Sequence, residues 1–244
     1  KIRSLVGLLP ICAVEVLPLG RLQDLKGFDK RMHWFLQNRK ELAERIQFAD
    51  EGLHAKALLA IPSRDQLQRV LRYMLDEDEF LSPYGIRSLS KVHEKEPFIF
   101  MHDKDEYRVD YTPAESQTHM FGGNSNWRGP IWFPINYLLI EALERYGRFY
   151  GDEFKVECPT RSGNWITLQA AADELAHRLT KLFVRGEDGR CPFAGSDDRF
   201  RDDPHYRDLV WFYEYFDGDT GRGCGASHQT GWTALVARCF RQRT

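Results

Sequence analysis

The sequence predicts a mostly α-helical protein with one small β-hairpin. Three observations lead to this fold class: apolar residues recur at helical spacing in several segments, capping signatures precede two helices, and strand-like alternation is confined to two short stretches. About seven helices follow from this pattern. With 244 residues, 42% of them hydrophobic, the chain is long enough for one domain with a sizeable core.

The first two helices are expected before residue 40. Pro10 suits the first turn of a helix that reaches about Leu17, because the N–H that proline lacks would have no partner there. The second helix is indicated by an apolar stripe at Phe28, Met32, Phe35 and Leu36.

Two capping boxes are expected to begin further helices. In this signature the side chains of a polar N-cap residue and of a Glu or Gln three residues later each accept a hydrogen bond from the other residue's backbone N–H. Asn38 with Glu41 fits the signature, and Ser63 with Gln66 repeats it. The helix after Ser63 is supported by apolar residues at Leu67, Val70, Leu71, Met74 and Leu75.

Three more helices are expected in the second half of the chain. The strongest periodicity spans Ile131 to Tyr146, and another run spans Thr167 to about Val184. The last helix is indicated by Trp232, Leu235, Val236 and Cys239.

Strands are expected at Phe98–Tyr111, as a hairpin around Asp103-Lys104-Asp105, and at the aromatic run Trp211–Phe216. The segments 76–129 and 186–226, which join helices, are long and rich in glycine, proline, serine and aromatic residues. Because long ordered connections on a rigid scaffold often carry function, we look for a site in these segments first.

Composition argues against several functional classes. Lysine and arginine total 34 against 36 acidic residues, so no basic stripe indicates a nucleic-acid partner. The five cysteines lie at long spacings without a CxxC pair, so we expect reduced thiols, no metal site and no cofactor. The apolar run Leu5–Leu17 is shorter than the roughly 20 residues of a membrane span and lacks a small-residue cleavage site. A cytoplasmic protein without a membrane partner is the default expectation.

The first candidate segment, Phe121–Trp132, leads into the helix with the strongest periodicity. It places amide, guanidinium and ring groups at one helix entrance: Asn124, Asn126, Trp127, Arg128 and Trp132. Amides and a planar guanidinium form forked hydrogen bonds to neighbouring hydroxyls, and indole rings offer a stacking face. This set suits a sugar. The alternative interpretation is a capped helix start with two buried tryptophans.

The second candidate segment, Trp211–Gly221, contains Glu214 between Tyr213 and Tyr215. A carboxylate with little water around it has a raised pKa, which suits a base that takes a proton from water near neutral pH. The alternative is a glutamate on the solvated face of an edge strand. Asp217-Gly218-Asp219 resembles part of a calcium loop, but the remaining ligands of such a loop are missing, so a turn is expected.

Two further segments, Ser227–Trp232 and Leu81–Ser90, join hydroxyl, amide or cationic groups to an aromatic ring at a helix boundary. Each signal is weak by itself. His228 alone would more often be a structural histidine than a catalyst.

Together, the four segments resemble the C-terminal catalytic region of glycoside hydrolase family 63, which includes processing α-glucosidase I, bacterial α-glucosidases and mannosylglycerate-type hydrolases. The resemblance rests on four ordered motifs: Ser82-Pro-Tyr-Gly-Ile-Arg87, Gly123-Asn-Ser-Asn-Trp-Arg-Gly-Pro-Ile-Trp132, Phe212-Tyr-Glu214 followed by Thr220-Gly221, and His228-Gln-Thr-Gly-Trp232. It implies an (α/α)6 toroid of twelve helices. With about seven helices in this chain, residues 1–244 are expected to be the C-terminal part of a single toroidal catalytic domain, and the missing N-terminal part of the same protein becomes its expected partner.

The resemblance also implies a mechanism. Glu214 corresponds to the family's general base, whereas the general acid is an Asp far upstream that has no counterpart here. The implied substrate is an oligosaccharide or small glycoside with a terminal α-linked glucose or similar sugar. The residues expected to bind it are Tyr84, Arg87, Asn126, Trp127, Arg128, Trp132, Tyr213, His228, Gln229 and Trp232. Asp103, Asp105, Asp110 and Glu115 are the alternative acids within the chain, but nothing in the family pattern supports them. A non-catalytic carbohydrate-binding or scaffold domain is the alternative function.

Overall fold

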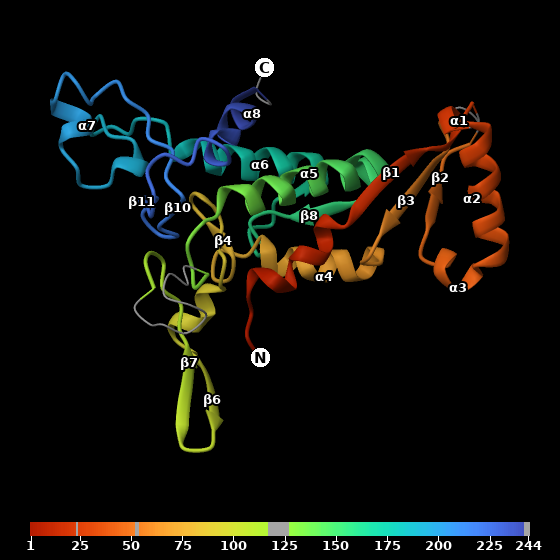
Figure 1. The fold of residues 1–244 in the computed structure, drawn as a ribbon, viewed down its shortest axis with the longest axis horizontal. Coiled ribbons are helices and arrows are strands. Elements are labelled where there is room, and N and C mark those ends of the chain that lie inside the picture. Colours follow the sequence, from red (N-terminus) through yellow and green to blue (C-terminus); the bar gives the residue numbers. More distant parts are fainter. Residues whose placement is uncertain (23, 52–53, 117–126, 242–244) are drawn as a thin grey trace.

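The computed structural model describes residues 1–22, 24–51, 54–116 and 127–241. Its centre is a pair of long helices, α5 (Phe133–Tyr150) and α6 (Leu168–Lys181), which pack along each other. Helix α4 (Arg64–Met74) lies alongside this pair (Figure 1). Fully buried side chains from the three helices share one apolar core: Leu67, Leu71, Met74, Leu139, Leu143, Tyr146, Leu175 and Leu179.

The three central helices confirm the predictions from periodicity. Helix α4 begins with the expected capping box, in which the backbone N–H of Gln66 donates to Ser63 and that of Ser63 to Gln66. Helix α6 is capped by Thr167, whose side chain accepts a hydrogen bond from the backbone of Ala170. Helix α5 starts two residues later than expected because the backbone of Ile131 pairs with other segments.

The predicted helix from Pro10 to Leu17 is wrong. Two short 3-10 helices, Leu5–Gly7 and Leu9–Cys12, are followed by strand β1 (Val14–Pro18). Pro10 lies in the first turn of the second 3-10 helix, where the N–H that proline lacks is not needed. The residues beyond it pair antiparallel with β3 (Lys56–Ala60), whose other edge pairs with β2 (Gln47–Ala49). A strand partner some forty residues away in the sequence gives no local signal.

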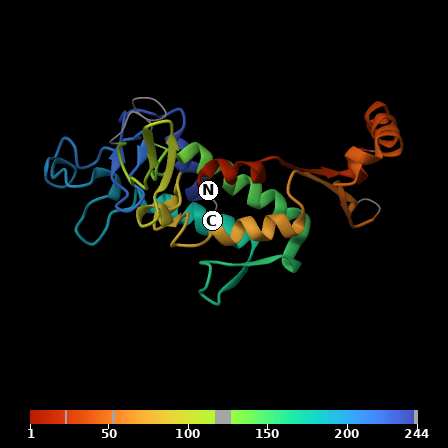
Figure 2. The same ribbon diagram turned by 90° about the horizontal axis from the view of Figure 1, so that it is seen from below.

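An N-terminal lobe, residues 14–60, forms around this sheet at one end of the molecule (Figures 1 and 2). It contains α1 (Leu19–Leu22), the predicted α2 (Lys26–Asn38) and α3 (Lys40–Ala43). The capping box at Asn38 is wrong, because the Asn38 amide donates to the Trp34 carbonyl of α2 instead. Helix α2 lies over an open apolar groove of about 620 Å³, so none of its residues is fully buried.

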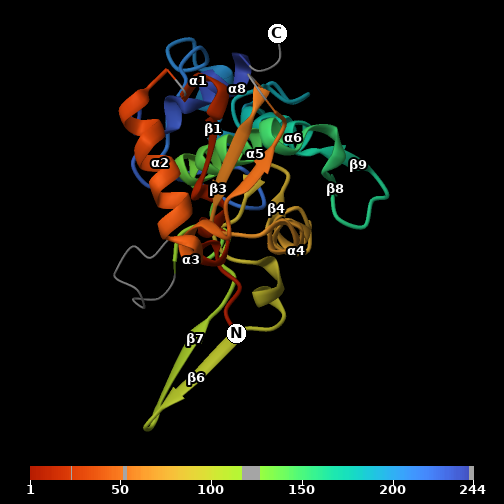
Figure 3. The ribbon, with the colours of Figure 1, turned by 90° about the vertical axis from the view of Figure 1, so that its right-hand side faces the viewer.

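Short hairpins complete the described structure. The predicted hairpin is confirmed as β6 (Phe98–His102) and β7 (Asp105–Val109), and it projects from the body (Figure 3). The predicted strand at Trp211–Phe216 is mostly irregular, with only its last two residues in a strand, β10. The remaining hairpins are β4 (Leu81–Ser82) with β5 (Gly85–Ile86), β8 (Lys155–Glu157) with β9 (Trp165–Thr167), and β10 (Tyr215–Phe216) with β11 (Gly223–Cys224). The remaining short helices include 3-10 turns at Lys91–Glu94 and Thr233–Leu235, with α7 (Arg199–Asp202) and α8 (Val236–Arg241).

The described residues are therefore rich in helix, as predicted, with one three-stranded and four two-stranded antiparallel sheets. They do not close into a barrel (Figure 1). Within the described ranges, no helix is both long enough and apolar enough to span a bilayer.

The two capping signatures give a stability test. Ser63→Ala removes a formed cap and should lower the free energy of unfolding by about 1 kcal/mol. Asn38→Ala removes only an exposed side-chain hydrogen bond and should change it by less than about 0.5 kcal/mol. Urea denaturation followed by circular dichroism measures both; equal effects would contradict the assignment of the caps.

Candidate active site

Backbone pairing brings the predicted motifs together. The N–H of Ser88 donates to the Pro130 carbonyl at 3.0 Å, and that of Ile131 donates to the Phe216 carbonyl at 2.8 Å. The N–H of Gln229 donates to the Phe212 carbonyl at 2.7 Å. Segments near residues 87, 131 and 216 therefore lie side by side, and the segment near 228 joins them through residue 212.

Stacked aromatic rings lie where these segments meet. The Trp132 ring stacks on Trp127, with ring centroids 4.3 Å apart and 8° between planes, and on Tyr215 at 4.9 Å and 24°. Trp232 meets Trp132 edge-on at 6.0 Å. We call these four rings the aromatic cluster. Trp132 is buried within it, whereas Trp127 is 45% exposed and leaves indole surface open to a ligand.

Trp232 adds an indole N–H to this cluster. Its Nε1 is buried and meets no acceptor within the part of the chain that the structure describes. Because buried polar groups normally have partners, this N–H is suited to a hydrogen bond with a bound molecule.

Glu214 lies at a bend just before β10, with its side chain half-buried. Its Oε2 accepts a hydrogen bond from the backbone N–H of Ala226 at 3.3 Å. Gly225, at φ +69°, lies directly against the carboxylate: a Cβ at this position would be 2.7 Å from Oε2. The glycine therefore lets the backbone approach and hold the Glu214 side chain. A fully solvated edge-strand glutamate, the alternative interpretation, is not what the structure shows.

Both tyrosines beside Glu214 are fixed by neighbouring backbone. The ring of Tyr213 lies on Gly223, where a Cβ would have no room, and its carbonyl accepts from the Thr233 hydroxyl at 2.6 Å. Burial raises the pKa of Tyr213. Burial, reinforced by neighbouring negative groups that include Glu214, raises the pKa of Tyr215 to about 12. Both hydroxyls therefore stay protonated at neutral pH.

Arg87, predicted to bind substrate, is committed to protein contacts. The side chain is almost fully buried. Its Nε donates to the Tyr111 hydroxyl at 3.0 Å, Nη1 to the Leu81 carbonyl at 2.6 Å, and Nη2 to Oδ1 of Asp219 at 3.2 Å. These contacts indicate a residue that organises the site, not one whose guanidinium faces a sugar.

Asp219 is the centre of this network. Besides Arg87, it accepts hydrogen bonds from Lys91 Nζ at 3.2 Å and from the Tyr111 hydroxyl at 3.0 Å. Burial alone would raise the pKa of Asp219, but the hydrogen bonds from Lys91 and Tyr111 and the charges of Arg87 and Lys91 lower it overall. The turn expected at Asp217–Asp219 and the predicted hairpin end at Tyr111 gave no sign of this contact, because the two residues are 108 positions apart in the sequence.

The other predicted residues take several positions. Arg128 is buried, and burial lowers the pKa of its guanidinium while the charge of Asp110 opposes this shift. Tyr84 is half-buried against Gly221, and burial together with the charge of Asp217 raises its pKa.

The residues predicted from the last motif hold this part of the chain by local contacts. His228 is exposed and lies 2.8 Å from the Ser227 hydroxyl. Gln229 contributes backbone hydrogen bonds to Phe212 and Thr233. Asn126, with the neighbouring Asn124, lies outside the described residues, so its predicted role stays a prediction.

None of the four carboxylates considered as an internal acid is suited to that role. Asp103 and Asp105 lie at the exposed tip of the hairpin, and Asp110 pairs with Arg108. Glu115 lies near Tyr215 and pairs with Arg222 at 2.8 Å. Burial would raise the pKa of Glu115, but the Arg222 hydrogen bond outweighs it, so this carboxylate stays ionised.

A carboxylate held beside stacked indole rings is typical of a site that binds or cleaves carbohydrate. Residues 55–233 match the family model described as "Mannosylglycerate hydrolase MGH1-like glycoside hydrolase domain". This match covers most of the chain and includes all four motifs, so the chain belongs to this family of glycoside hydrolase domains. The predicted resemblance to glycoside hydrolase family 63 is thereby confirmed.

The chain is also similar to curated relatives, two of which are named as a glucosidase and a hydrolase. The chain is 52% identical over 241 residues to the uncharacterized protein YMR196W of Saccharomyces cerevisiae. The matched region covers 97% of this chain and 22% of that protein. It is 30% identical over 183 residues to the mannosyl-oligosaccharide glucosidase of the same yeast, covering 74% of this chain and 16% of the relative. It is 31% identical over 110 residues to the mannosylglycerate hydrolase of Rubrobacter radiotolerans, covering 45% of this chain and 15% of the relative. The chain thus spans only about a fifth or less of the length of these relatives.

The Asp219 network predicts a pH dependence of stability. Because its pKa is lowered in the folded protein, Asp219 contributes stability above the unfolded value of about 3.9, and this contribution is lost as the pH falls through the folded pKa. The stability advantage of the wild type over Asp219→Asn should therefore be constant near neutral pH and shrink between about pH 5 and pH 2. Asp103→Asn, at an exposed position, is the control and should show no such change. Denaturant titrations at several pH values measure the difference; a constant difference down to the lowest pH would contradict this role.

Proposed function

We propose that the protein containing this chain is an inverting glycoside hydrolase that acts on a terminal α-linked glucose or a similar sugar, with Glu214 as the general base. The observation that carries the proposal is the half-buried Glu214 carboxylate, held by the backbone of Gly225 and Ala226 beside the aromatic cluster. The family membership and the glucosidase relative support a glycosidase.

In this proposal, different side chains stack on the pyranose, hydrogen-bond to it and activate water. The exposed indole of Trp127 offers a stacking face for the sugar, and the buried Nε1 of Trp232 offers a donor to one of its hydroxyls. Glu214 would take a proton from a water molecule as that water attacks the anomeric carbon, and its hydrogen bond from Ala226 would hold the carboxylate in position.

Inversion also requires a general acid on the opposite side of the sugar, about 6.5 to 9.5 Å from the base. Since none of the internal candidates suits this role, we propose that the acid comes from a part of the protein outside residues 1–244. In this view α4, α5 and α6 belong to an (α/α)6 toroid whose remaining helices complete the cleft. The substrate and the assembly are proposals for the whole protein.

The assignment of the base is tested in the full-length protein by Glu214→Gln. Turnover of a terminal α-glucoside should fall by roughly 10²–10⁴-fold, because the amide cannot accept the proton from water. Glu115→Gln is the matched control, because Glu115, like Glu214, lies near Tyr215. Neutralising this carboxylate should change turnover only a few-fold. Retained turnover in Glu214→Gln would refute the assignment. Sugar binding by a wild type that hydrolyses no glycoside would favour the non-catalytic alternative.

The contact between Gly225 and Glu214 is tested by Gly225→Ala. The new Cβ would displace the carboxylate, so kcat should fall at least about 10-fold with little change in KM. Gly163→Ala is the control, because Gly163 also has positive φ but no atom within 4 Å of the new Cβ. Both variants should lose roughly 1–2 kcal/mol of stability from backbone strain, but only the first should lose activity. Equal kinetics for the two variants would contradict the role of the contact.

A further inference from the structure

The hairpin of β6 and β7 forms an arm that extends from the body beside the candidate site (Figures 1 and 3). In its register Phe98 faces Val109 and Phe100 faces Tyr107. Because directly opposed residues share a face and side chains alternate along a strand, these four residues lie on one face. We call it the aromatic face of the arm. The opposite face carries Ile99, Met101, Glu106 and Arg108.

Much of the aromatic face is open to solvent. Phe100 is 53% exposed and Tyr107 41% exposed, and the Phe100 ring stacks with His102 farther along the strand. Apolar residues exposed on a projecting element usually mark a binding surface, and an isolated two-stranded hairpin is marginally stable by itself. The opposite face is exposed as well, with Ile99 at 49% and Met101 at 57%, so the aromatic face differs from it by offering rings on which a sugar can stack.

The aromatic face runs without a break into the candidate site. At the base of the arm Phe98 and the buried Val109 pack with Leu89 and Tyr111. Tyr111 donates to Asp219.

The same tyrosine touches both segments that carry the aromatic cluster and Glu214. A Cβ at Gly129 would lie 2.7 Å from the Tyr111 ring, and one at Gly218 would lie 2.9 Å from its hydroxyl. Two glycines thus allow Tyr111 to join the arm directly to the site.

We propose that the aromatic face of the arm is a subsite for the distal sugar units of an oligosaccharide whose terminal unit occupies the site at Glu214. The inference rests on the proposed function and specifies its substrate as an oligosaccharide longer than a disaccharide. A five-residue strand spans about 16 Å, which is long enough for several sugar units in a row. Phenyl and phenol rings offer stacking faces, while the Tyr107 hydroxyl and the His102 imidazole offer hydrogen bonds to sugar hydroxyls.

The test compares two ligands and two faces of the arm. Binding of a glucose-terminated pentasaccharide and of methyl α-glucoside is measured by calorimetry in full-length protein carrying Glu214→Gln, so that turnover does not interfere. Phe100→Ala with Tyr107→Ala should weaken pentasaccharide binding at least about 10-fold and leave methyl α-glucoside binding within two-fold. Ile99→Ala with Met101→Ala, on the opposite face, is the matched control and should leave both affinities within two-fold.

Three binding results would overturn the proposal: no loss of pentasaccharide affinity, equal loss from the two faces, or equal loss for the two ligands. If light scattering shows a dimer for the wild type and a monomer for the aromatic-face variant, the surface binds a second copy of the protein instead. If the alanine variant does not fold, Phe100→Leu with Tyr107→Leu keeps apolar volume without rings and should show the same selective loss.

The outcome separates this inference from the proposed function. Pentasaccharide binding through the aromatic face in a protein whose wild type hydrolyses nothing would leave the subsite standing and refute the hydrolase. Hydrolysis of both ligands by the wild type, with unchanged affinities in the arm variants, would support the hydrolase and refute the subsite.

Discussion

The buried guanidinium of Arg87 is the interaction on which the arrangement of the site depends. Removing such a cation from water is costly unless acceptors surround it. Leu81 provides an acceptor from the same hairpin as Arg87, and Tyr111 and Asp219 provide acceptors from segments 24 and 132 residues away. The segments must therefore meet around Arg87 at the same time. The backbone of Arg87 also pairs with Ile131, which directly precedes Trp132 of the aromatic cluster.

Glu214 shows how this framework positions a carboxylate that lies on neither a helix nor a strand. It lies at a bend, yet backbone groups hold it on one side and the fixed rings of its neighbours flank it in the chain. The nearby ion pair between Glu115 and Arg222 ties another segment to the start of β11, the strand that pairs with β10 after Glu214. The position of the Glu214 carboxylate is thus set by several loops that meet on packed helices. For this reason a single sequence motif does not define the site.

Predictions from the sequence succeeded where the signal is local. Ser63 with Gln66, the periodicity of α5 and α6, and the hairpin turn all act over a few residues. They failed at β1, whose conformation depends on a distant strand. The residue types of the site were also recognisable, but the roles of Arg87 and Asp219 were not, because the acceptors around a guanidinium are known only once the segments are assembled.

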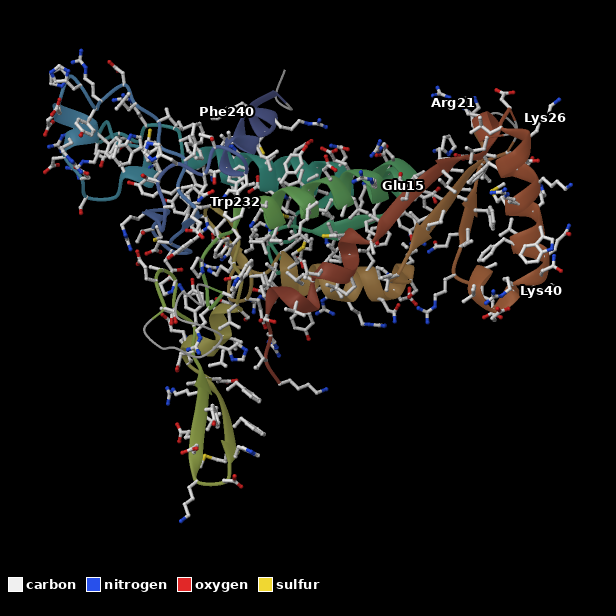
Figure 4. All side chains as sticks on the ribbon, in the orientation of Figure 1. Glu15, Arg21, Lys26, Lys40, Trp232 and Phe240 are labelled. Atoms are coloured by element: carbon white, nitrogen blue, oxygen red, sulfur yellow. The ribbon has the colours of Figure 1, made fainter. Side chains whose placement is uncertain are left out.

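The three-stranded sheet crosses the boundary of the segment that matches the family. The segment that matches the family begins at residue 55, so β3 falls inside it whereas β1 and β2 fall outside (Figure 1). A chain trimmed to the family limits would keep β3 with both edges bare, and bare edges recruit strands from other molecules. It would also lose the core residues Leu5, Leu8 and Ile11. The lobe stands far from Trp232, with Arg21, Lys26 and Lys40 at its outer end (Figure 4). Its sheet nevertheless joins it to the segment that matches the family, through the pairing of β3 with β1 and β2.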